Sequence, residues 1–524
     1  MSFPDARKTA GLVAALLSVL LAVAFGIAYS QKRSAELRTR DWIVQWLRQK
    51  FRGDVELANF HVQVFPTMSV SGDGLSVHYW AAPKAPPLLQ VEHFSFELGF
   101  LGIFRVPHRV RRVHLRQMVI LIPPRELRKT FPSNAPLPIP QVTIGEIECD
   151  DAELLTLSSE PGKEPLDWKI HNLVLKNVGA EQPFSFRGTL TNAKPKGEIA
   201  TSGNFGPWNA DDPGSTPVSG TYGFSQADLG PFPGIAGILS STGKYSGELD
   251  KLEVQGQTDT PNFSLDSAGK PVFLHTDYSA TVDGTNGDTL LHPVHAILGE
   301  SVIVATGSVI NVPSQKGHQI TLDVTTPGAR IEDILQLAIN SDRPFLRGPV
   351  EIKTKLTIPP ADQKVIDKMT LDGAFAVTNG HWASPELREK LQSLSRHAEG
   401  KPEEEDAGSS VTNFNGKFVL KNSVITFSKL AFSVPGAEVQ LAGSYDMHSQ
   451  AIDMQGHLRM RARLSQTTTG AKSFFLKAID PLFSKHGAGT ELPLSITGTQ
   501  DSPLIGVSVF HKKMEKQVGK QGLL

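Results

Sequence analysis

Apolar and polar residues alternate in short runs along most of the chain after residue 53. The alternation is clearest at 94–100, 350–358 and 371–377. Successive side chains of a β-strand point to opposite faces, so each run predicts a strand with one apolar and one polar face. Further runs of this kind lie at 113–122, 414–420, 439–445 and 452–460. The pattern therefore predicts a protein that is mainly β.

Residues typical of tight turns separate these runs. The chain holds 46 glycines and 36 prolines, enough to punctuate many short elements. The strongest turn signals are Ser71-Gly72-Asp73-Gly74, Asn286-Gly287, Asn379-Gly380, Asn415-Gly416 and Pro435-Gly436. Strands joined by such turns, with few helices between them, predict an antiparallel meander.

Three later segments carry helical periodicity instead. They are Ile331 to Ile339, Ser384 to Glu399, which opens with the Ser-Pro start of a capped helix, and Ser465 to Phe483. The acidic run 403–406 is expected to be a solvated loop. So few helices cannot cover the apolar faces of so many strands.

An uncharged apolar segment lies near the N-terminus. Residues 11–29 read GLVAALLSVLLAVAFGIAY, and a helix of that length covers about 28 Å, close to the thickness of membrane hydrocarbon. The alternative is a cleaved signal peptide that ends near Gly26-Ile27-Ala28, but secretory apolar regions span only about 7–15 residues. The segment therefore favours an uncleaved transmembrane helix.

The residues that follow, 34–52, predict an amphipathic helix. Apolar side chains recur every three or four residues towards Phe51, with Arg and Lys among them. Two interpretations stay open: the helix packs on the following sheet, or it lies at the membrane surface. In the second, the membrane-surface residues are Trp42, Trp46, Arg38 and Arg48.

Charge excludes one class of function but does not orient the anchor. The chain carries 52 basic and 53 acidic residues, so it lacks the basic surplus typical of a nucleic-acid-binding protein. Seven Lys or Arg residues lie in 31–52 and two before the apolar segment, which by the positive-inside rule would keep the body in the cytoplasm. Large domains often cross regardless of such charge, so the count alone does not choose.

Signals for catalysis or metal binding are weak. No Walker, Rossmann or Gly-x-Ser-x-Gly motif occurs. His292 and His295 lack a nearby acidic ligand, and a hairpin turn explains 283–288 better than a calcium loop. The lone Cys149 excludes an intramolecular disulfide and is expected to be a buried apolar side chain. We therefore expect no enzymatic activity, no metal and no cofactor; a hydrolase would need an acid–base pair that only the fold can assemble.

Several segments together resemble a known family. Near the N-terminus these are the anchor with its helix, then Phe51 to Leu57, Val64 to Val70, and the strand runs 91–101 and 113–123. In the C-terminal part they are 414–460 and a weaker copy of the same unit at 296–310. In this order of elements the chain resembles the AsmA family of bacterial envelope proteins.

The resemblance implies an anchor in the bacterial inner membrane, crossed once, with the body in the periplasm. It also implies an elongated, twisted antiparallel sheet shaped as a groove, similar to bridge-like lipid transfer proteins, with a few covering helices. The implied role is in outer-membrane lipid homeostasis or assembly. The implied partners are the inner membrane, phospholipid and other envelope proteins. No nucleic-acid partner is expected, because of the balanced charge noted above.

These observations divide the chain into consecutive parts. They are the tail and transmembrane anchor 1–33, the juxtamembrane helix 34–52, an N-terminal β region 53–202, a Gly- and Pro-rich boundary or insertion 203–235, a central β region with short helices 236–410, a C-terminal β region 411–510 with the helix 465–483, and a basic tail 511–524.

An apolar sheet face that helices cannot cover must be buried against a second sheet or a ligand. The leading hypothesis is a groove that binds phospholipid acyl chains. Its candidate residues are Ile352, Leu356, Leu371, Phe375, Val377, Phe418, Leu441 and Met454. The alternative is a closed sandwich, in a structural or interaction protein that modulates outer-membrane protein assembly without carrying lipid.

Overall fold

The computed structural model describes most of the chain between residues 53 and 507. The described residues are 44, 48, 53–63, 68–79, 87–98, 108–122, 142–157, 165–179, 182–209, 212–232, 234–265, 270–312, 315, 317–338, 344, 346–361, 363–383, 385–400, 411–463, 489–499 and 502–507. They form an open, mainly antiparallel β-sheet with a few short helices, which confirms the expected mainly β class.

The chain divides into two compact units. Unit 1 comprises Met1–Phe232, Ile238–Thr260 and Asp277–Leu290, and unit 2 comprises Pro233–Gly237, Pro261–Thr276 and Leu291–Leu524. Three strands, β12 (Lys251–Leu265), β13 (Val272–Val282) and β14 (Thr289–Leu298), contribute residues to both units.

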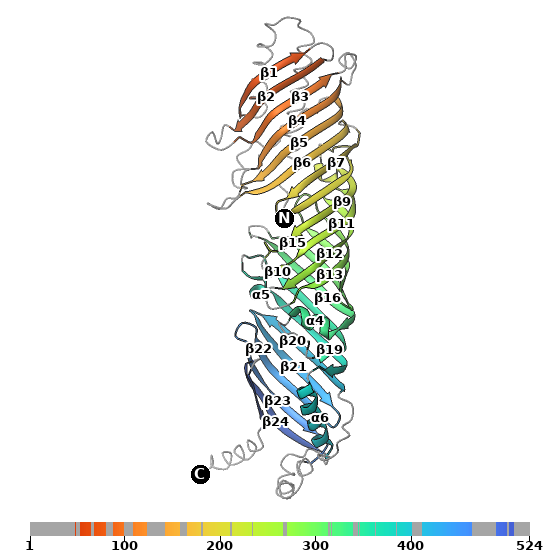
Figure 1. Cartoon of the computed structure of the whole chain (residues 1–524), viewed down its shortest axis with the longest axis vertical. Coiled ribbons are helices and arrows are strands. Elements are labelled where there is room, and N and C mark those ends of the chain that lie inside the picture. The colour runs from red at the N-terminus through yellow and green to blue at the C-terminus, as the bar shows by residue number, and fades with distance from the viewer. Residues whose placement is uncertain are drawn as a thin grey trace. The chain divides into compact units, whose positions relative to one another are not determined.

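Unit 1 is built from long strands that lie side by side, as Figure 1 shows for β1 to β6. Their bounds are β1 Gly53–Gln63, β2 Met68–Tyr79, β3 Leu89–Leu98, β4 His108–Ile122, β5 Val142–Thr156, β6 Leu166–Val178, β7 Phe184–Asn192, β8 Gly197–Phe205, β9 Pro217–Asp228 and β11 Ile238–Glu248, with a 3-10 turn η2 at Pro213–Ser215. The Gly- and Pro-rich segment 203–235 contains all of β9.

Strands of unit 1 pair with their neighbours in chain order from β1 to β9, and β11 then pairs with β9 and β12. One pair departs from the expected antiparallel meander: β4 and β5 run parallel, with His108 opposite Val142. A parallel pair needs a crossover of about a dozen residues or more, and 123–141 supplies that length.

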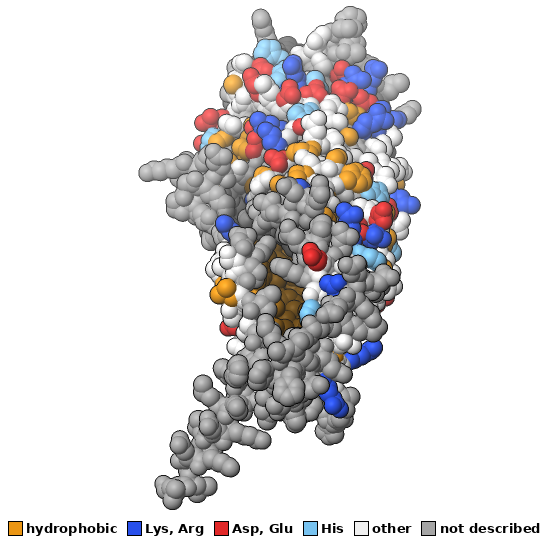
Figure 2. Space-filling model, turned by 60° about the horizontal axis from the view of Figure 1, so that its bottom comes forward, with side chains coloured by type: hydrophobic (Ala, Val, Ile, Leu, Met, Phe, Trp, Pro, Cys, Tyr) orange, Lys and Arg blue, Asp and Glu red, His pale blue; other side chains and the backbone are white. Residues whose placement is uncertain are grey.

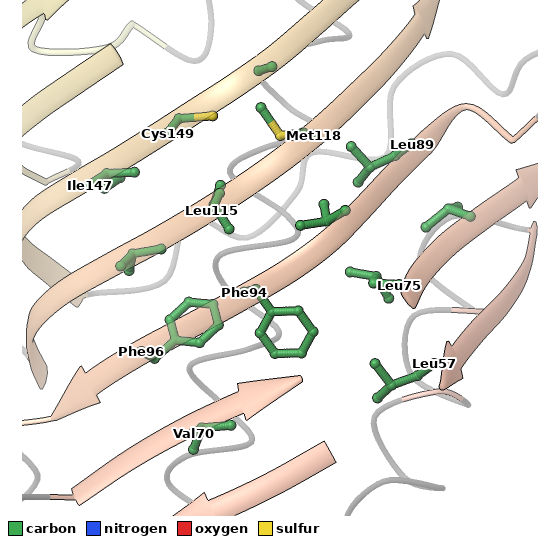
Figure 3. Close-up of a cluster of buried hydrophobic side chains, with 14 of the residues drawn as sticks. Leu57, Val70, Leu75, Leu89, Phe94, Phe96, Leu115, Met118, Ile147 and Cys149 are labelled. Atoms are coloured by element: carbon green, nitrogen blue, oxygen red, sulfur yellow. The ribbon is translucent and has the colours of Figure 1, made fainter. Parts of the chain in front are cut away.

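The core of unit 1 lies on one face of β1 to β5 (Figure 3). Phe94 and Phe96 are fully buried there, and Cys149 is buried as expected. Burial raises the pKa of the Cys149 thiol to about 12, so the thiol stays protonated and unreactive. Gly72 is the cross-strand partner of Phe94, and a Cβ at Gly72 would lie 2.4 Å from Phe94 Cζ. Because Gly72 has no side chain, the buried Phe94 ring can occupy this space.

Charged side chains line strands of unit 1 away from this core. Glu97, Arg112, Glu146 and Lys176 hold successive partner positions on β3 to β6. Next to them, His114 Nε2 lies 2.8 Å from Asp150 Oδ2, and Asn172 Nδ2 donates to Asp150 Oδ1 at 2.8 Å. The hydrogen bonds from His114 and Asn172 hold the pKa of Asp150 below its ordinary value.

Unit 2 continues with shorter elements. They are β10 Ile235–Ala236, β14 Thr289–Leu298, β15 Ser301–Asn311, β16 His318–Arg330, α4 Ile331–Ala338, β17 Leu346–Arg347, β18 Pro349–Ile358, α5 Val365–Lys368, β19 Thr370–Trp382, α6 Pro385–Glu399, β20 Val411–Lys421, β21 Val424–Val434, β22 Ala437–Asp446, β23 Ala451–Met460, β24 Thr490–Thr499 and β25 Ser502–Val507. Antiparallel pairing runs from β15 through β16, β18 and β19 and then in chain order to β25.

Two helix predictions in unit 2 are confirmed, α4 and α6. A buried polar group holds α4 at the end of β15: Ser301 Oγ lies 2.7 Å from Asp333 Oδ2, and the Glu300 amide donates to the same oxygen at 2.9 Å. Asp333 therefore accepts a hydrogen bond from the buried Ser301 hydroxyl, in the first turn of a helix, where negative charge is favoured.

Turn predictions divide into two groups. Asn286-Gly287 and Pro435-Gly436 do form turns between strands, and Gly436 has φ +81°. Three others are wrong, because 71–74, 379–380 and 415–416 lie inside β2, β19 and β20. Asn379 lies in a bulge between Val377 and Gly380, where the pairing with β20 shifts. In the other two, glycine is needed for an aromatic neighbour rather than for a turn.

The predicted helix 34–52 is described at Val44 and Arg48, and both are helical. Val44 packs against the unit 1 core, while Arg48 Nη2 lies 2.9 Å from Asp54 Oδ1. These contacts support the interpretation of a helix packed on the following sheet. The predicted segments 11–29, 403–406, 465–483 and 511–524 lie outside the described residues. None of the helices that the structure describes is long and apolar enough to span a membrane.

Candidate functional site

The strand register of unit 2 brings the predicted groove residues together. Ile352 on β18 is directly opposite Phe375 on β19, and Leu356 is opposite Leu371. Val377 lies opposite Val350. Directly opposite residues of an antiparallel pair point to the same face of the sheet. These residues of β18 and β19 therefore share one face.

The same face continues across the following strands. Phe418 on β20 is opposite Gly373, Leu441 on β22 is opposite Leu430, and Met454 on β23 is opposite Gly443. Stepping from partner to partner through β19 to β23 never changes the face. All eight predicted residues thus lie on one continuous surface, which we call the apolar face of unit 2.

Several further residues of this face were not predicted. Three of them, Phe427, Leu430 and Phe432, lie on β21, where a bulge at 428–429 reverses the alternation. A prediction from strict alternation fails across a bulge, because the extra residue moves the apolar positions from odd to even residue numbers. The face also includes Ile320, Leu322, Val324, Phe414, Leu494 and Ile496, at partner positions on β16, β20 and β24.

An aromatic cluster lies at the centre of the face. The ring of Phe375 is 5.1 Å from that of Phe414 and 6.3 Å from that of Phe418, centroid to centroid. Gly416 is the cross-strand partner of Phe375, and a Cβ there would meet the Phe375 ring at 2.8 Å. The Phe375 ring therefore lies over Gly416 and shields the glycine backbone from solvent.

Burial varies along the face. Val377 and Leu441 are buried, whereas the other six predicted residues are only partly buried. Each buried position belongs to a cluster that includes a helix. Val377 shares its cluster with Ile331, Ile334 and Leu335 of α4, and Leu441 shares its cluster with Leu394 and Ala398 of α6. Part of the apolar face is therefore protein core, and part is not fully covered.

Helix α6 is held by hydrogen bonds to the strand ends. Ser395 Oγ donates to the Pro435 carbonyl at 2.7 Å, and the Ala462 amide donates to the Ala398 carbonyl at 2.8 Å.

In the view of Figure 2 the surface is hollowed, and hydrophobic side chains line the hollow. This is the surface character that an apolar ligand requires.

The opposite face of the same strands is polar. Glu351, Lys353 and Lys355 alternate with the apolar positions of β18 and are exposed. Lys355 lies between Asp323 and Asp372 on the neighbouring strands, so charge is balanced across this row. Unit 2 therefore presents one apolar and one hydrated face, as the alternation predicted.

One cluster has the residue types of a hydrolase but not the geometry. Ser423 Oγ donates to Asp367 Oδ1 at 2.8 Å, and His448 Nε2 lies 2.7 Å from that same oxygen. In a catalytic triad the histidine lies between serine and carboxylate to take the serine proton. Here both contact the carboxylate, so Asp367 ties α5 to two strand turns, and the hydrogen bonds from Ser423 and His448 lower its pKa.

Metal-binding geometry is likewise missing where the sequence raised it. His292 and His295 both lie within β14, three residues apart, where strand geometry sends them to opposite faces. Asp283 Oδ1 accepts hydrogen bonds from the amide and hydroxyl of Thr285, as in a turn. Among the residues that the structure describes, no three His, Cys, Asp or Glu side chains cluster as metal ligands.

Of the predicted membrane-surface residues, the structure describes only Arg48. Its guanidinium forms the ion pair with Asp54 and reaches the Val55 carbonyl at 3.5 Å. Arg38, Trp42 and Trp46 lie outside the described residues.

Comparison with known proteins adds no relative. No family model, no curated protein and no solved structure matches this chain.

Proposed function

We propose that this protein binds the acyl chains of phospholipid on the apolar face of unit 2. The observation that carries the proposal is the strand register, which places all eight candidate residues on one face. Six of the eight stay partly exposed, and the described helices α4 and α6 cover the face only in part. An apolar surface of this extent favours a hydrophobic occupant.

The energetics favour hydrocarbon as the occupant. Each methylene removed from water contributes about 0.8 kcal/mol, so a bound acyl chain is retained without any specific polar contact. A headgroup cannot enter such a face without losing its hydration, so it would stay in solvent. This division suits a phospholipid and does not suit a fully polar ligand.

The proposal includes the cellular setting. The segment 11–29 supports a single-pass membrane anchor, and the resemblance to the AsmA family supports an inner-membrane location with the body in the periplasm. In that setting the protein would serve outer-membrane biogenesis without catalysing a reaction. Envelope proteins that deliver or accept lipid would be its partners.

Lipid extraction from matched variants tests the proposal. Full-length wild type, Phe375→Glu and Lys353→Glu are purified in the same detergent, and co-purified phospholipid is quantified by mass spectrometry. Lys353 lies on the polar face, so its variant controls for the added negative charge. We expect Phe375→Glu to lose most of the lipid that wild type and Lys353→Glu retain. Equal phospholipid in all three would contradict the proposal and favour a closed, structural sheet.

A further inference from the structure

A second group of side chains, in unit 1, has a composition unlike that of the apolar face of unit 2. Tyr222 on β9 is the cross-strand partner of Gly243 on β11, and Tyr245 on β11 is the partner of Gly220 on β9. A Cβ at Gly243 would lie 2.8 Å from Tyr222 Cε1, and one at Gly220 would lie 2.6 Å from the Tyr245 hydroxyl. Each ring therefore occupies the space that its partner's side chain would fill. With Tyr278 they form what we call the tyrosine section.

The tyrosine section lies on the same face as the core of unit 1. From Cys149 on β5 the partner positions run through Leu173 and Gly188 to Thr201 on β8, and then to Tyr222. The core residues at the start of this path are buried, whereas Tyr222 and Tyr245 are about half-buried. The face thus opens as it passes from β5 to β11.

The hydroxyl groups of the section are bonded to one another and to the backbone. Ser241 Oγ donates to the Gln257 carbonyl at 3.1 Å and lies 3.3 Å from the hydroxyls of Tyr222 and Tyr278. A hydroxyl has one proton, and a carbonyl can only accept. Because Ser241 gives its proton to the carbonyl, both tyrosines must donate to Ser241.

The same reasoning applies to Tyr245. Thr201 Oγ1 donates to the Thr221 carbonyl at 2.9 Å and lies 2.9 Å from the Tyr245 hydroxyl. Tyr245 is therefore the donor to Thr201. All three tyrosine protons point into the protein, and partial burial raises the pKa of Tyr222 and Tyr245, which keeps them protonated.

These positions make the section apolar in spite of its hydroxyl groups. The tyrosine protons that an anion would need are already bound, so each tyrosine can offer a ligand its ring but no free donor. We propose that the tyrosine section is a second contact site for lipid hydrocarbon, and one that gives an anionic headgroup no tyrosine hydrogen bond. This inference rests on the proposed function, and it specifies which part of the lipid contacts unit 1.

Two photoreactive lipids test the inference. Both are phosphatidylcholines, one with a diazirine in an acyl chain and one with a diazirine in the headgroup, each mixed into phosphatidylcholine vesicles that contain the full-length protein. After illumination, labelled residues are mapped by peptide mass spectrometry. We expect the chain probe to label Tyr222 or Tyr245 at least tenfold more than the headgroup probe does. Thr221 and Lys244, which alternate with them on the same strands, are the exposed controls and should stay unlabelled by the chain probe.

Variants separate the rings from the hydroxyls. Tyr245→Phe keeps the ring and should retain chain labelling of β9 and β11, while Tyr245→Glu should reduce it at least tenfold without changing labelling of β18 to β20. Chain labelling of β18 to β20 alone would overturn the inference and leave the proposed function standing. Labelling of neither region would overturn both. Equal labelling of the tyrosine section by the two probes would overturn the inference.

Discussion

Ile352 and Phe375 are direct cross-strand partners on β18 and β19, and neither side chain is fully buried. Both also pack against the buried cluster that contains Val350 and Val377, so the pair lies at the border between core and open face. A charge introduced at this border can distinguish an open ligand-binding face from a closed core, because it destabilises the fold much more in a closed core.

The first prediction uses this pair. On an open face the carboxylate of Ile352→Glu keeps access to water, so the variant should fold and change the unfolding free energy by no more than about 1–2 kcal/mol. In a closed core the same change would cost several kcal/mol or prevent folding. Denaturant unfolding followed by circular dichroism measures the difference. Lys355→Glu, on the hydrated face, is the control, and a folded Lys355→Glu beside an unfolded or degraded Ile352→Glu would favour the sandwich.

A second prediction concerns the core of unit 1. Gly72→Ala would place a Cβ 2.4 Å from Phe94 Cζ and 2.7 Å from the Asn59 carbonyl oxygen, so ring and backbone must both move. Overpacking of this kind costs about 1–3 kcal/mol. A Cβ at Gly223 would have no described neighbour within 4 Å, so Gly223→Ala should change stability by about 0.5 kcal/mol or less. Equal unfolding midpoints for the two variants would contradict this role of Gly72.

The strand pattern was predictable from the sequence, because alternation is a local property that a one-sided sheet imposes on every strand. The role of Gly72 and Gly416 was not, since a glycine that accommodates a ring on the next strand looks like a turn residue until the register is known. The β4–β5 direction was hidden for the same reason: alternation is identical in parallel and antiparallel strands.

The candidate face shows the same division. Its eight predicted residues lie on regularly alternating strands, so the alternation predicted the face of the strand to which each of them belongs. Phe427 and Leu430 were missed because the bulge between them changes the phase of β21. The tyrosine section was missed because Tyr222 and Gly243 are distant in sequence and meet only through strand pairing.

The third prediction concerns pH. The bonds from His114 and Asn172 lower the pKa of Asp150 below its ordinary value of 3.8, so they stabilise the folded state above that pH. This stabilisation is lost as the pH falls through the lowered pKa. The carboxylate is partly exposed, and solvent screening limits the effect to about 1 kcal/mol or less. Asp150→Asn should therefore be slightly less stable than wild type at neutral pH, with the difference shrinking below pH 3.8. A difference in unfolding midpoint that stays constant across this range would contradict the prediction.

The fourth prediction concerns topology. A reporter enzyme that is active only outside the cytoplasm, fused after Leu524, should be active if the body is exported. The seven basic residues of 31–52 argue for the opposite orientation, so the outcome is not trivial. A matched fusion to a reporter that works only in the cytoplasm is the control. Activity of that second fusion alone would rule out the periplasmic location.

Site-specific photocrosslinking in living cells tests the central claim most directly. A photoreactive phenylalanine analogue replaces Phe375 in one variant of the full-length protein and Ala374, the adjacent residue on the opposite face, in the other. After illumination, each protein is purified under denaturing conditions and its covalent adducts are identified by mass spectrometry. Binding of lipid on the apolar face of unit 2 predicts phospholipid adducts joined through their acyl chains at position 375 and none at position 374. Adducts with protein alone at position 375, or lipid adducts of equal yield at both positions, would contradict it.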